Sequence, residues 1–193
     1  NTLYLNADGI LCGHNTDGIG LVCDIKLNHG GSLAGKNLLV LGAGGATRGI
    51  LQPLLEECPA AITIANRTIS KAESLAHEFG NSAAANHNET AISGCGFKAL
   101  AGKSFDWIIN ATSASLQGEV PSLPAGLVTA ETWCYDLMYS DNATPFYQWA
   151  SDTGADRVMD GLGMLVEQAA ESFLTWRGMR PQTETVIALL RNN

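Results

Sequence analysis

The chain has 193 residues, of which 46% are hydrophobic and 16% are charged, and its formal net charge is −8 at pH 7. A chain of this composition can fold around a core, and its acidic balance argues against nucleic acid or an anionic membrane as the main partner. Five cysteines without a C-x-x-C pair and four scattered histidines offer neither metal-ligand spacing nor a disulfide framework. We therefore expect a cytoplasmic protein with reduced thiols, no metal and no membrane-spanning segment.

The first predicted elements are a hairpin and a helix. Two apolar runs flank an Asp-Gly turn, which predicts a β-hairpin over residues 3–12. Apolar side chains then recur at helical spacing, which predicts a helix over residues 17–28 that ends at a glycine pair.

From residue 36 onward, short apolar runs alternate with helical patterns. Strands are predicted over residues 37–41, 61–65, 107–110, 132–136 and 157–159. Helices are predicted over about 46–57, 70–79 and 161–177, with another starting at Thr144-Pro145 and a last one running from Pro181 to Leu190. Small residues between 81 and 102 predict only an edge strand and a helical turn. The alternation predicts an α/β fold, a doubly wound, mostly parallel, Rossmann-like sheet with helices on both faces.

A glycine-rich turn follows the first of these parallel strands. Small side chains there let phosphate oxygens approach the backbone N–H groups at a helix N-terminus. The pattern departs from G-x-G-x-x-G because Thr47 occupies the place of the third glycine. We expect the pyrophosphate of a dinucleotide to be bound by Gly42, Ala43, Gly44, Gly45 and Ala46.

The end of the next strand indicates which dinucleotide binds. NAD-binding proteins usually carry an acid about 20 residues past the glycines, where it accepts a hydrogen bond from the ribose 2′-hydroxyl. This chain has Asn66-Arg67 at that point, and a guanidinium pairs instead with phosphate oxygens. Thr68 and Lys71 add a hydroxyl and a second positive charge, although Lys71 by itself resembles an ordinary surface lysine. The sequence therefore predicts NADP as the cofactor.

Other polar segments allow more than one interpretation. Residues 110–113, with Thr112 as a cofactor contact, and residues 136–139 follow predicted strands and are expected to line the same crevice. Asp17 is either a helix cap or a catalytic carboxylate, and Gln168 is either one polar residue on a helix or part of a site.

Taken together, the motifs resemble one known family. In chain order they are Asn1-Thr-Leu, Asn15-Thr-Asp-Gly18, Gly42-Ala-Gly-Gly-Ala46, Asn66-Arg-Thr68, Ile109-Asn-Ala-Thr-Ser113, Tyr135-Asp-Leu-Met-Tyr139, Thr144-Pro-Phe146 and Asp160-Gly-Leu-Gly-Met164 with Gln168. The set closely resembles the bacterial shikimate dehydrogenases over nearly the whole chain. The resemblance implies an oxidoreductase that reduces 3-dehydroshikimate to shikimate with NADPH, in aromatic amino-acid biosynthesis.

The resemblance also implies roles for individual residues. Asp17 matches an aspartate that contacts the ring hydroxyls of the substrate and works with a lysine in proton transfer. Leu137 and Gly161 match positions at the nicotinamide end, and the family more often has methionine at the first of them. Substrate hydrogen bonds are implied for Asn1, Tyr139 and Gln168, and the 2′-phosphate pocket is implied for Asn66, Arg67, Thr68 and Lys71.

The sequence differs from the family pattern at its front. Family members carry an N-terminal substrate domain of roughly a hundred residues, with carboxylate-binding serines and the catalytic lysine, and this sequence contains none of it. We therefore expect residues 1–16 to be a connecting segment from that domain, with the hairpin, and residues 17–193 to be the NADP-binding domain. Such a polypeptide would bind NADPH and be inactive alone.

Two alternatives stay open at this point. One is a quinate/shikimate dehydrogenase that uses NAD or NADP, which the positive charge of Arg67 and Lys71 disfavours. The other is a non-catalytic NADPH-binding module, which the substrate-contacting residues disfavour. The family contains monomers and homodimers, and the sequence does not choose between them.

Overall fold

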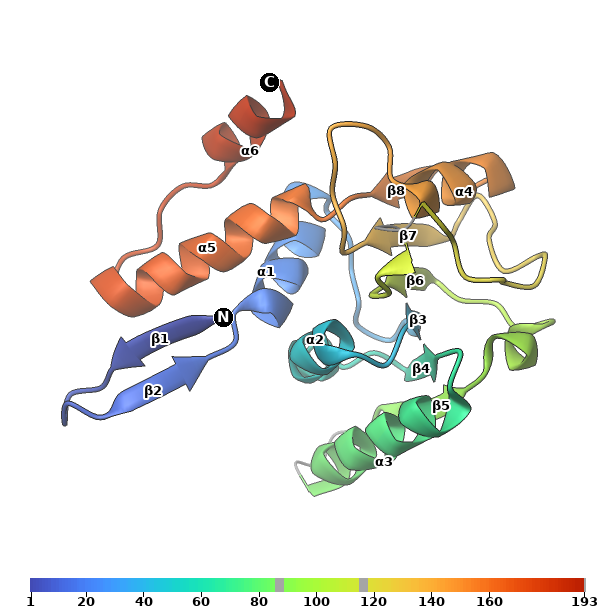
Figure 1. Cartoon of the computed structure of the whole chain (residues 1–193), viewed down its shortest axis with the longest axis horizontal. Coiled ribbons are helices and arrows are strands. Elements are labelled where there is room, and N and C mark those ends of the chain that lie inside the picture. Colours follow the sequence, from blue (N-terminus) through green and yellow to red (C-terminus); the bar gives the residue numbers. More distant parts are fainter. Residues whose placement is uncertain (86–88, 115–117, 193) are drawn as a thin grey trace. The chain divides into compact units, whose positions relative to one another are not determined.

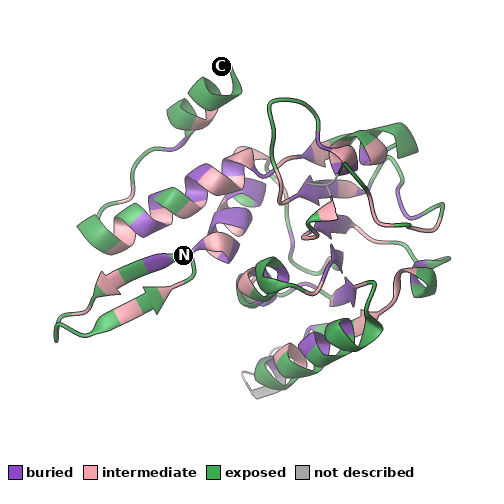
Figure 2. Ribbon diagram, viewed as in Figure 1, coloured by how far each residue is buried: buried purple, intermediate pink, exposed green. Residues whose placement is uncertain are grey.

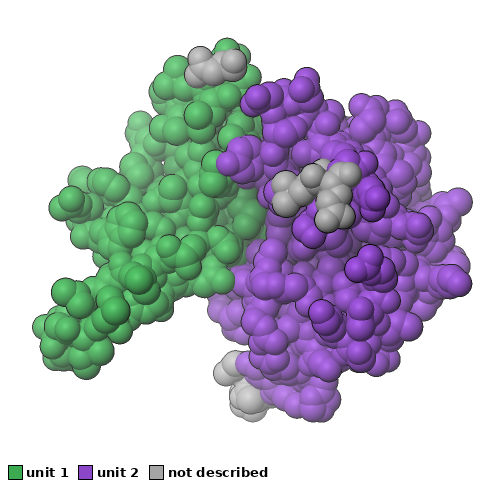
Figure 3. All heavy atoms as spheres, in the orientation of Figure 1, with its two compact units in different colours: residues 1–32, 162–193 green, residues 33–161 purple. Residues whose placement is uncertain are grey.

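The computed structural model of the chain describes residues 1–85, 89–114 and 118–192. The chain forms two compact units: a terminal unit of residues Asn1–Ser32 and Leu162–Asn193, and a sheet unit of residues Leu33–Gly161 (Figure 3). The expected division at residues 16 and 17 follows the family's domain organisation, and it stays a prediction.

The sheet unit is a doubly wound α/β fold. Its strands are β3 (Asn37–Leu41), β4 (Ala61–Ala65), β5 (Ala91–Cys95), β6 (Trp107–Asn110), β7 (Trp133–Asp136) and β8 (Arg157–Met159). They form a six-stranded sheet in the order β5-β4-β3-β6-β7-β8, and all neighbouring strands are parallel. The order reverses direction between β3 and β6, which creates the switch point where ligands of such sheets bind. The predicted fold class is confirmed.

Helices cover both faces of this sheet. They are α2 (Gly45–Glu56), α3 (Ile69–Ala85) and α4 (Pro145–Thr153), with a short 3₁₀-helix η2 (Phe97–Leu100). Figure 1 shows α2 and α3 on one side of the strands and α4 on the other. Thr144 caps α4 as predicted, because its hydroxyl accepts a hydrogen bond from the N–H of Tyr147 at 3.1 Å. The edge strand and helical turn expected between residues 81 and 102 are β5 and η2, and residues 86–88 of that stretch lie outside the described residues.

The core of the sheet unit lies between the strands and these helices. All four residues of β6 and four of the five in both β3 and β4 are buried, which explains why their sequences are nearly continuous apolar runs (Figure 2). The largest buried side chains include Trp107, Tyr135 and Phe146. Asp106 ties β6 to β3 at the amino-terminal edge of the sheet, since it accepts hydrogen bonds from the N–H of Asn37 at 2.8 Å and from Lys36 Nζ at 3.2 Å.

The terminal unit combines a hairpin with helices from both ends of the chain. Strands β1 (Thr2–Leu5) and β2 (Leu11–His14) pair antiparallel, as predicted. Helix α1 (Asp17–Cys23) continues into a π-helix, η1 (Asp24–Asn28), and helices α5 (Leu162–Arg177) and α6 (Glu184–Arg191) complete the unit. Gly20 lets α1 approach α5 closely, because a Cβ there would lie 2.7 Å from the backbone nitrogen of Gln168.

A buried ionic network stabilises the terminal unit. Glu167 is 1% exposed, and its carboxylate accepts hydrogen bonds from Arg180 at 2.6 Å, Thr183 at 2.7 Å and Asn28 at 3.0 Å. The same Asn28 amide donates to the buried Asp24 at 2.8 Å, so the network joins η1 to α5 and to the segment before α6. Satisfying both buried carboxylates in this way offsets the cost of removing them from water.

Two predicted helix boundaries are wrong. The last helix begins at Glu184 and not at Pro181, because the Thr183 hydroxyl is held by Glu167 and keeps the preceding residues out of the helix. The helix expected to end near Phe79 continues to Ala85, since a glycine inside a helix costs only about 1 kcal/mol and alanines follow it. Within the described part of the chain, no helix is both long and apolar enough to cross a membrane.

Candidate functional site

The glycine turn between β3 and α2 has a geometry that requires glycine at its start. Gly42 has φ of 104°, in the left-handed region, and a Cβ there would lie 3.0 Å from the carbonyl oxygen of Ala111. Its N–H donates to the carbonyl of Ala65 at 2.8 Å, which fixes the turn against β4. The sequence prediction of a tight turn at this point is confirmed.

The next two glycines leave open space beside the first turn of α2. Gly44 is the N-cap residue, and no side chain caps the helix. A Cβ on Gly44 or on Gly45 would meet no heavy atom within 4 Å. The N–H groups of this first turn have no partner within the helix, and together with the helix dipole they favour an anion. The turn is therefore accessible to a phosphate group.

Thr47 explains the departure from the usual glycine pattern. Its side chain is fully buried, and its hydroxyl donates to the carbonyl of Gly42 at 2.9 Å. The third glycine of the usual pattern serves close packing between helix and strand. Here a small polar side chain fills that place and gives the turn an additional hydrogen bond.

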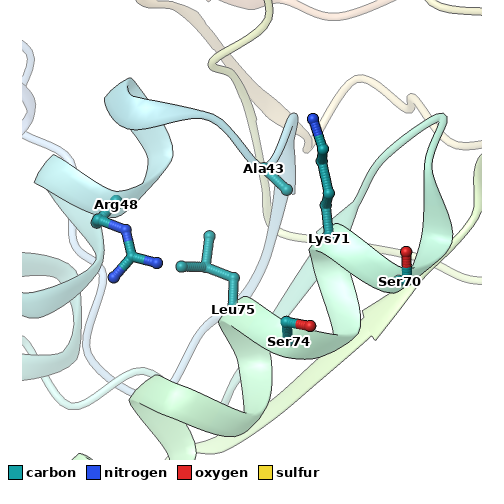
Figure 4. Close-up of a pocket in the computed structure, with 6 residues that line it drawn as sticks. All are labelled: Ala43, Arg48, Ser70, Lys71, Ser74 and Leu75. Carbon is teal, nitrogen blue, oxygen red and sulfur yellow. The ribbon is translucent and has the colours of Figure 1, made fainter.

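A pocket of about 260 Å³ lies between α2 and α3. It is lined by Ala43, Arg48, Ser70, Lys71, Ser74 and Leu75. Figure 4 shows Lys71 extending beside Ala43, whereas the Arg48 guanidinium reaches across from α2 toward Leu75. The pocket therefore joins one residue of the glycine turn to basic and hydroxyl side chains of the neighbouring helices.

Arg48 is paired with an acid on α3. Its guanidinium donates to both carboxylate oxygens of Glu78, at 2.9 Å from Nη2 and at a shorter distance from Nη1, and both side chains are 54% exposed. These hydrogen bonds hold the pKa of Glu78 below its usual value. An exposed pair of this kind contributes little to stability because solvent screens it.

The segment after β4 presents the other predicted basic residue. Asn66 fixes this segment, since its N–H donates to the carbonyl of Cys95 at 3.0 Å and its side-chain amide donates to the carbonyl of Thr68 at 2.9 Å. Arg67 and Thr68 are exposed. Neither Arg67 nor Lys71 forms an ion pair with any residue of the described ranges, so both charges can meet an anionic ligand.

Polar side chains at the ends of β6 and β7 form a buried cluster. Asn110 and Asp136 are paired in register across the two strands and are both fully buried. The Asp136 carboxylate accepts hydrogen bonds from Asn110 Nδ2 at 2.9 Å, from the N–H of Met138 at 3.1 Å and from Thr144 Oγ1 at 2.6 Å. Asn110 Oδ1 in turn accepts from the hydroxyl of Thr112 at 2.7 Å. The sequence predicted that residues 110–113 and 136–139 lie together at one edge of the sheet, but not the hydrogen bonds that Asp136 makes there.

Leu137 and Gly161 come together at the same edge of the sheet. The N–H of Leu137 donates to the carbonyl of Asn110 at 2.9 Å, and the N–H of Gly161 donates to the carbonyl of Met138 at 3.0 Å. A Cβ on Gly161 would lie 2.2 Å from the carbonyl oxygen of Leu137, so only glycine allows this approach.

The predicted substrate residues are divided between the two units. In the terminal unit, Asn1 Nδ2 donates to Asp17 Oδ1 and to Gln168 Oε1, each at 2.6 Å. Asp17 is the first residue of α1, and Thr16 is its N-cap without a side-chain bond, so capping does not account for Asp17. Tyr139 belongs to the sheet unit and is 47% exposed. The structure therefore brings together Asn1, Asp17 and Gln168.

Comparison with known proteins identifies the family. Residues 24–117 match the family described as shikimate/quinate 5-dehydrogenase, and residues 161–191 match the shikimate 5′-dehydrogenase C-terminal domain. A shikimate dehydrogenase (NADP(+)) from Marinobacter nauticus is 53% identical over 193 residues, which are 100% of this chain and 68% of that protein. The chain belongs to the shikimate dehydrogenase family.

Further relatives of this shikimate dehydrogenase family member agree in sequence and in structure. The Methylococcus capsulatus shikimate dehydrogenase (NADP(+)) is 56% identical over 98% of this chain and 66% of its own length. The crystal structure of an Ael1 enzyme from Pseudomonas putida matches with a TM-score of 0.86 and 46% identity, over 97% of this chain and 66% of that one. Shikimate 5-dehydrogenase from Thermus thermophilus, in complex with NADP(H) and shikimate, matches with a TM-score of 0.77 and 30% identity, over 97% and 66% of the two chains. The chain thus spans about two thirds of the length of these proteins.

Proposed function

We propose that this chain binds NADPH and that, within a shikimate dehydrogenase, it serves the reduction of 3-dehydroshikimate to shikimate. The observation that carries the proposal is the open first turn of α2, with Lys71 in the adjoining pocket and Arg67 exposed after β4; within the described residues neither cation forms an ion pair. The names of the relatives from Marinobacter and Methylococcus, which specify NADP(+), support it. When bound, this dinucleotide supplies or accepts a hydride.

Each part of the dinucleotide has residues that fit it. The backbone of residues 42–46 would bind the pyrophosphate at the N-terminus of α2. Arg67 and Lys71 would pair with the 2′-phosphate, and Asn66 and Thr68 would shape the segment around it. Thr112, Leu137 and Gly161 would line the nicotinamide end.

A titration with NADPH and NADH tests the cofactor proposal. Because NADH lacks the 2′-phosphate, we expect the chain to bind NADPH at least about ten-fold more tightly, which corresponds to about 1.4 kcal/mol. Arg67→Gln should remove most of that preference and leave NADH affinity unchanged. Arg157→Gln is the matched control, since it removes the same charge at the amino-terminal edge of the sheet, where Arg157 lies 4.9 Å from the Trp133 ring centroid. Equal affinities of the unaltered chain for the two cofactors would refute the proposal.

We further propose that Asp17 exchanges a proton with a substrate hydroxyl as hydride moves at the adjacent carbon. The Asp17 carboxylate accepts a hydrogen bond from Asn1 Nδ2 at 2.6 Å, and it can likewise accept one from a substrate hydroxyl. Asn1 and Gln168 would bind neighbouring hydroxyls of the substrate, and Tyr139 is a further proposed substrate-binding residue.

The 193-residue polypeptide by itself should have little dehydrogenase activity. Within the described residues, Asp17 has no lysine as an ion-pair partner, and general acid–base assistance is worth about 10² to 10⁴ in rate. The assay is shikimate-dependent reduction of NADP(+) by a preparation whose NADPH binding has been verified. Clear turnover in that preparation would contradict the expectation.

A quinate/shikimate dehydrogenase that also uses NAD is the second candidate, because the matched family includes quinate dehydrogenases by its description. It predicts similar affinities for NADPH and NADH, and similar binding of shikimate and quinate. A non-catalytic NADPH-binding module predicts that neither acid binds to the protein, even in a polypeptide of the relatives' full length.

A further inference from the structure

The buried cluster at the ends of β6 and β7 is arranged around one carboxylate. Asp136 is fully buried, and both of its oxygens accept hydrogen bonds: Oδ1 from Asn110 Nδ2 and the N–H of Met138, and Oδ2 from the hydroxyl of Thr144. The Thr144 bond is 2.6 Å long, within the range of hydrogen bonds from a hydroxyl to a carboxylate.

The hydrogen bonds of Asp136 extend into two loops at the carboxyl edge of the sheet. By holding the amide of Asn110, Asp136 turns Asn110 Oδ1 toward Thr112, which donates from its N–H at 3.2 Å and from its hydroxyl at 2.7 Å. Asp136 also accepts from the N–H of Met138 and so fixes the second of these loops. The carbonyl of Met138 in turn accepts from the N–H of Gly161 at 3.0 Å. One side chain therefore orients both loops.

The neighbours of Asp136 favour a carboxylate over an amide at this position. A carboxylate only accepts hydrogen bonds, and donors face it from both sides. An asparagine whose oxygen still faced Asn110 and Met138 would place its NH₂ group against Thr144, whose hydroxyl would have to turn from donor to acceptor, and all three hydrogen bonds would lose the assistance of the negative charge. If that NH₂ group faced Asn110 instead, a compensating rotation of the Asn110 amide would present the NH₂ group of Asn110 to Thr112, so the mismatch would move into the loop.

We propose that Asp136 is a positioning residue for the nicotinamide half of the cofactor. It acts through Asn110 on Thr112 and through Met138 on Leu137 and Gly161, and the adenosine half of the cofactor is independent of it. This inference rests on the proposed NADPH binding. Different side chains support the two halves of the site, and Asp136 sets the geometry of the nicotinamide half only.

The test compares two ligands by calorimetric titration. NADPH occupies both halves of the site, whereas adenosine 2′,5′-bisphosphate carries the adenosine and the 2′-phosphate without the nicotinamide. We expect Asp136→Asn to weaken NADPH binding by about ten-fold or more and to change the affinity for the bisphosphate by less than about two-fold. The control is Asp106→Asn, which alters a carboxylate with comparable hydrogen bonds at the opposite edge of the sheet. It should leave the ratio of the two affinities unchanged.

A second pair of variants keeps the test decisive if Asp136→Asn does not fold. Thr144→Val removes the hydroxyl that donates to Asp136, whereas Thr144→Ser keeps it. We expect Thr144→Val to lose NADPH affinity, by less than Asp136→Asn does, and Thr144→Ser to lose none. Binding of the bisphosphate should be unchanged in both Thr144 variants. Equal losses for both ligands, or no loss for either, would overturn the inference. If the unaltered protein binds neither ligand, the proposed function itself fails.

Discussion

Replacing Gly44 by alanine separates binding from folding at the glycine turn. The backbone at Gly44 has φ of −98° and ψ of −166°, which alanine adopts without strain, and its Cβ would meet no heavy atom within 4 Å. Replacing glycine by alanine at such a position raises the free energy of unfolding by about 0.4–1 kcal/mol, because the unfolded chain has less conformational entropy. Alanine is a poorer N-cap residue than glycine by up to about 1 kcal/mol. The two effects oppose each other, so the free energy of unfolding should change by less than about 1 kcal/mol.

The same methyl group would occupy space proposed for the pyrophosphate. A phosphate oxygen displaced from one backbone N–H loses a charge-assisted hydrogen bond worth about 1.5–3 kcal/mol, or about ten- to 150-fold in affinity. Calorimetric titration should show this loss for NADPH and NADH alike, because both carry the pyrophosphate. Thermal unfolding should shift by less than about 4 °C.

The matched comparison is Gly42→Ala, two residues earlier. Its φ of 104° and its Cβ only 3.0 Å from a carbonyl oxygen predict a clear loss of stability there, together with any loss of binding. Undiminished NADPH affinity in Gly44→Ala would refute the placement of the pyrophosphate. A large fall in its melting temperature would refute the reasoning that the site is open.

Three further predictions concern the sheet unit. Gly94→Ala should destabilise the fold by at least about 1–3 kcal/mol in denaturant unfolding, since a Cβ would lie 2.4 Å from the backbone of α3. Burial would raise the pKa of Asp106, but its hydrogen bonds and the Lys36 charge outweigh this and lower the pKa below 3.8. The unaltered chain should therefore exceed Asp106→Asn in free energy of unfolding by a constant amount at pH values above 3.8. This excess should shrink as the pH falls below 3.8 and Asp106 becomes protonated. Burial raises the pKa of Cys134 to about 12, so native-state alkylation at pH 8 followed by mass spectrometry should modify exposed Cys58 and spare Cys134.

Much of the sheet unit was predictable because its signals are local. The strands at 37–41, 61–65, 107–110 and 157–159 were predicted to the residue, since the first three are short, almost fully buried apolar runs between turn residues. The cap of α4 at Thr144 was predicted from two adjacent residues. The glycine turn was predicted from its place between strand and helix.

The parts that sequence reasoning missed depend on contacts between distant residues. The start of α6 is set by the bond between Thr183 and Glu167, which are 16 positions apart. Apolar spacing did not reveal the switch from α1 to the π-helix: helical spacing places Leu27 on the apolar face, but it is 70% exposed, whereas Asp24 and Ile25 are buried. The role of Asp136 follows from its register with Asn110 on a strand 26 positions earlier, and no local pattern contains that pairing.

The composition of the terminal unit has a consequence for how the protein is made. That unit joins residues 1–32 to residues 162–193, whereas the sheet unit is one uninterrupted stretch. During synthesis, α1 leaves the ribosome well before α5, against which it packs, has been translated. The sheet unit can therefore complete its folding before residues 162–193, which residues 1–32 need as partners, have been synthesised. Ribosomes arrested at increasing lengths should show protease resistance first in the sheet unit and last in residues 1–32.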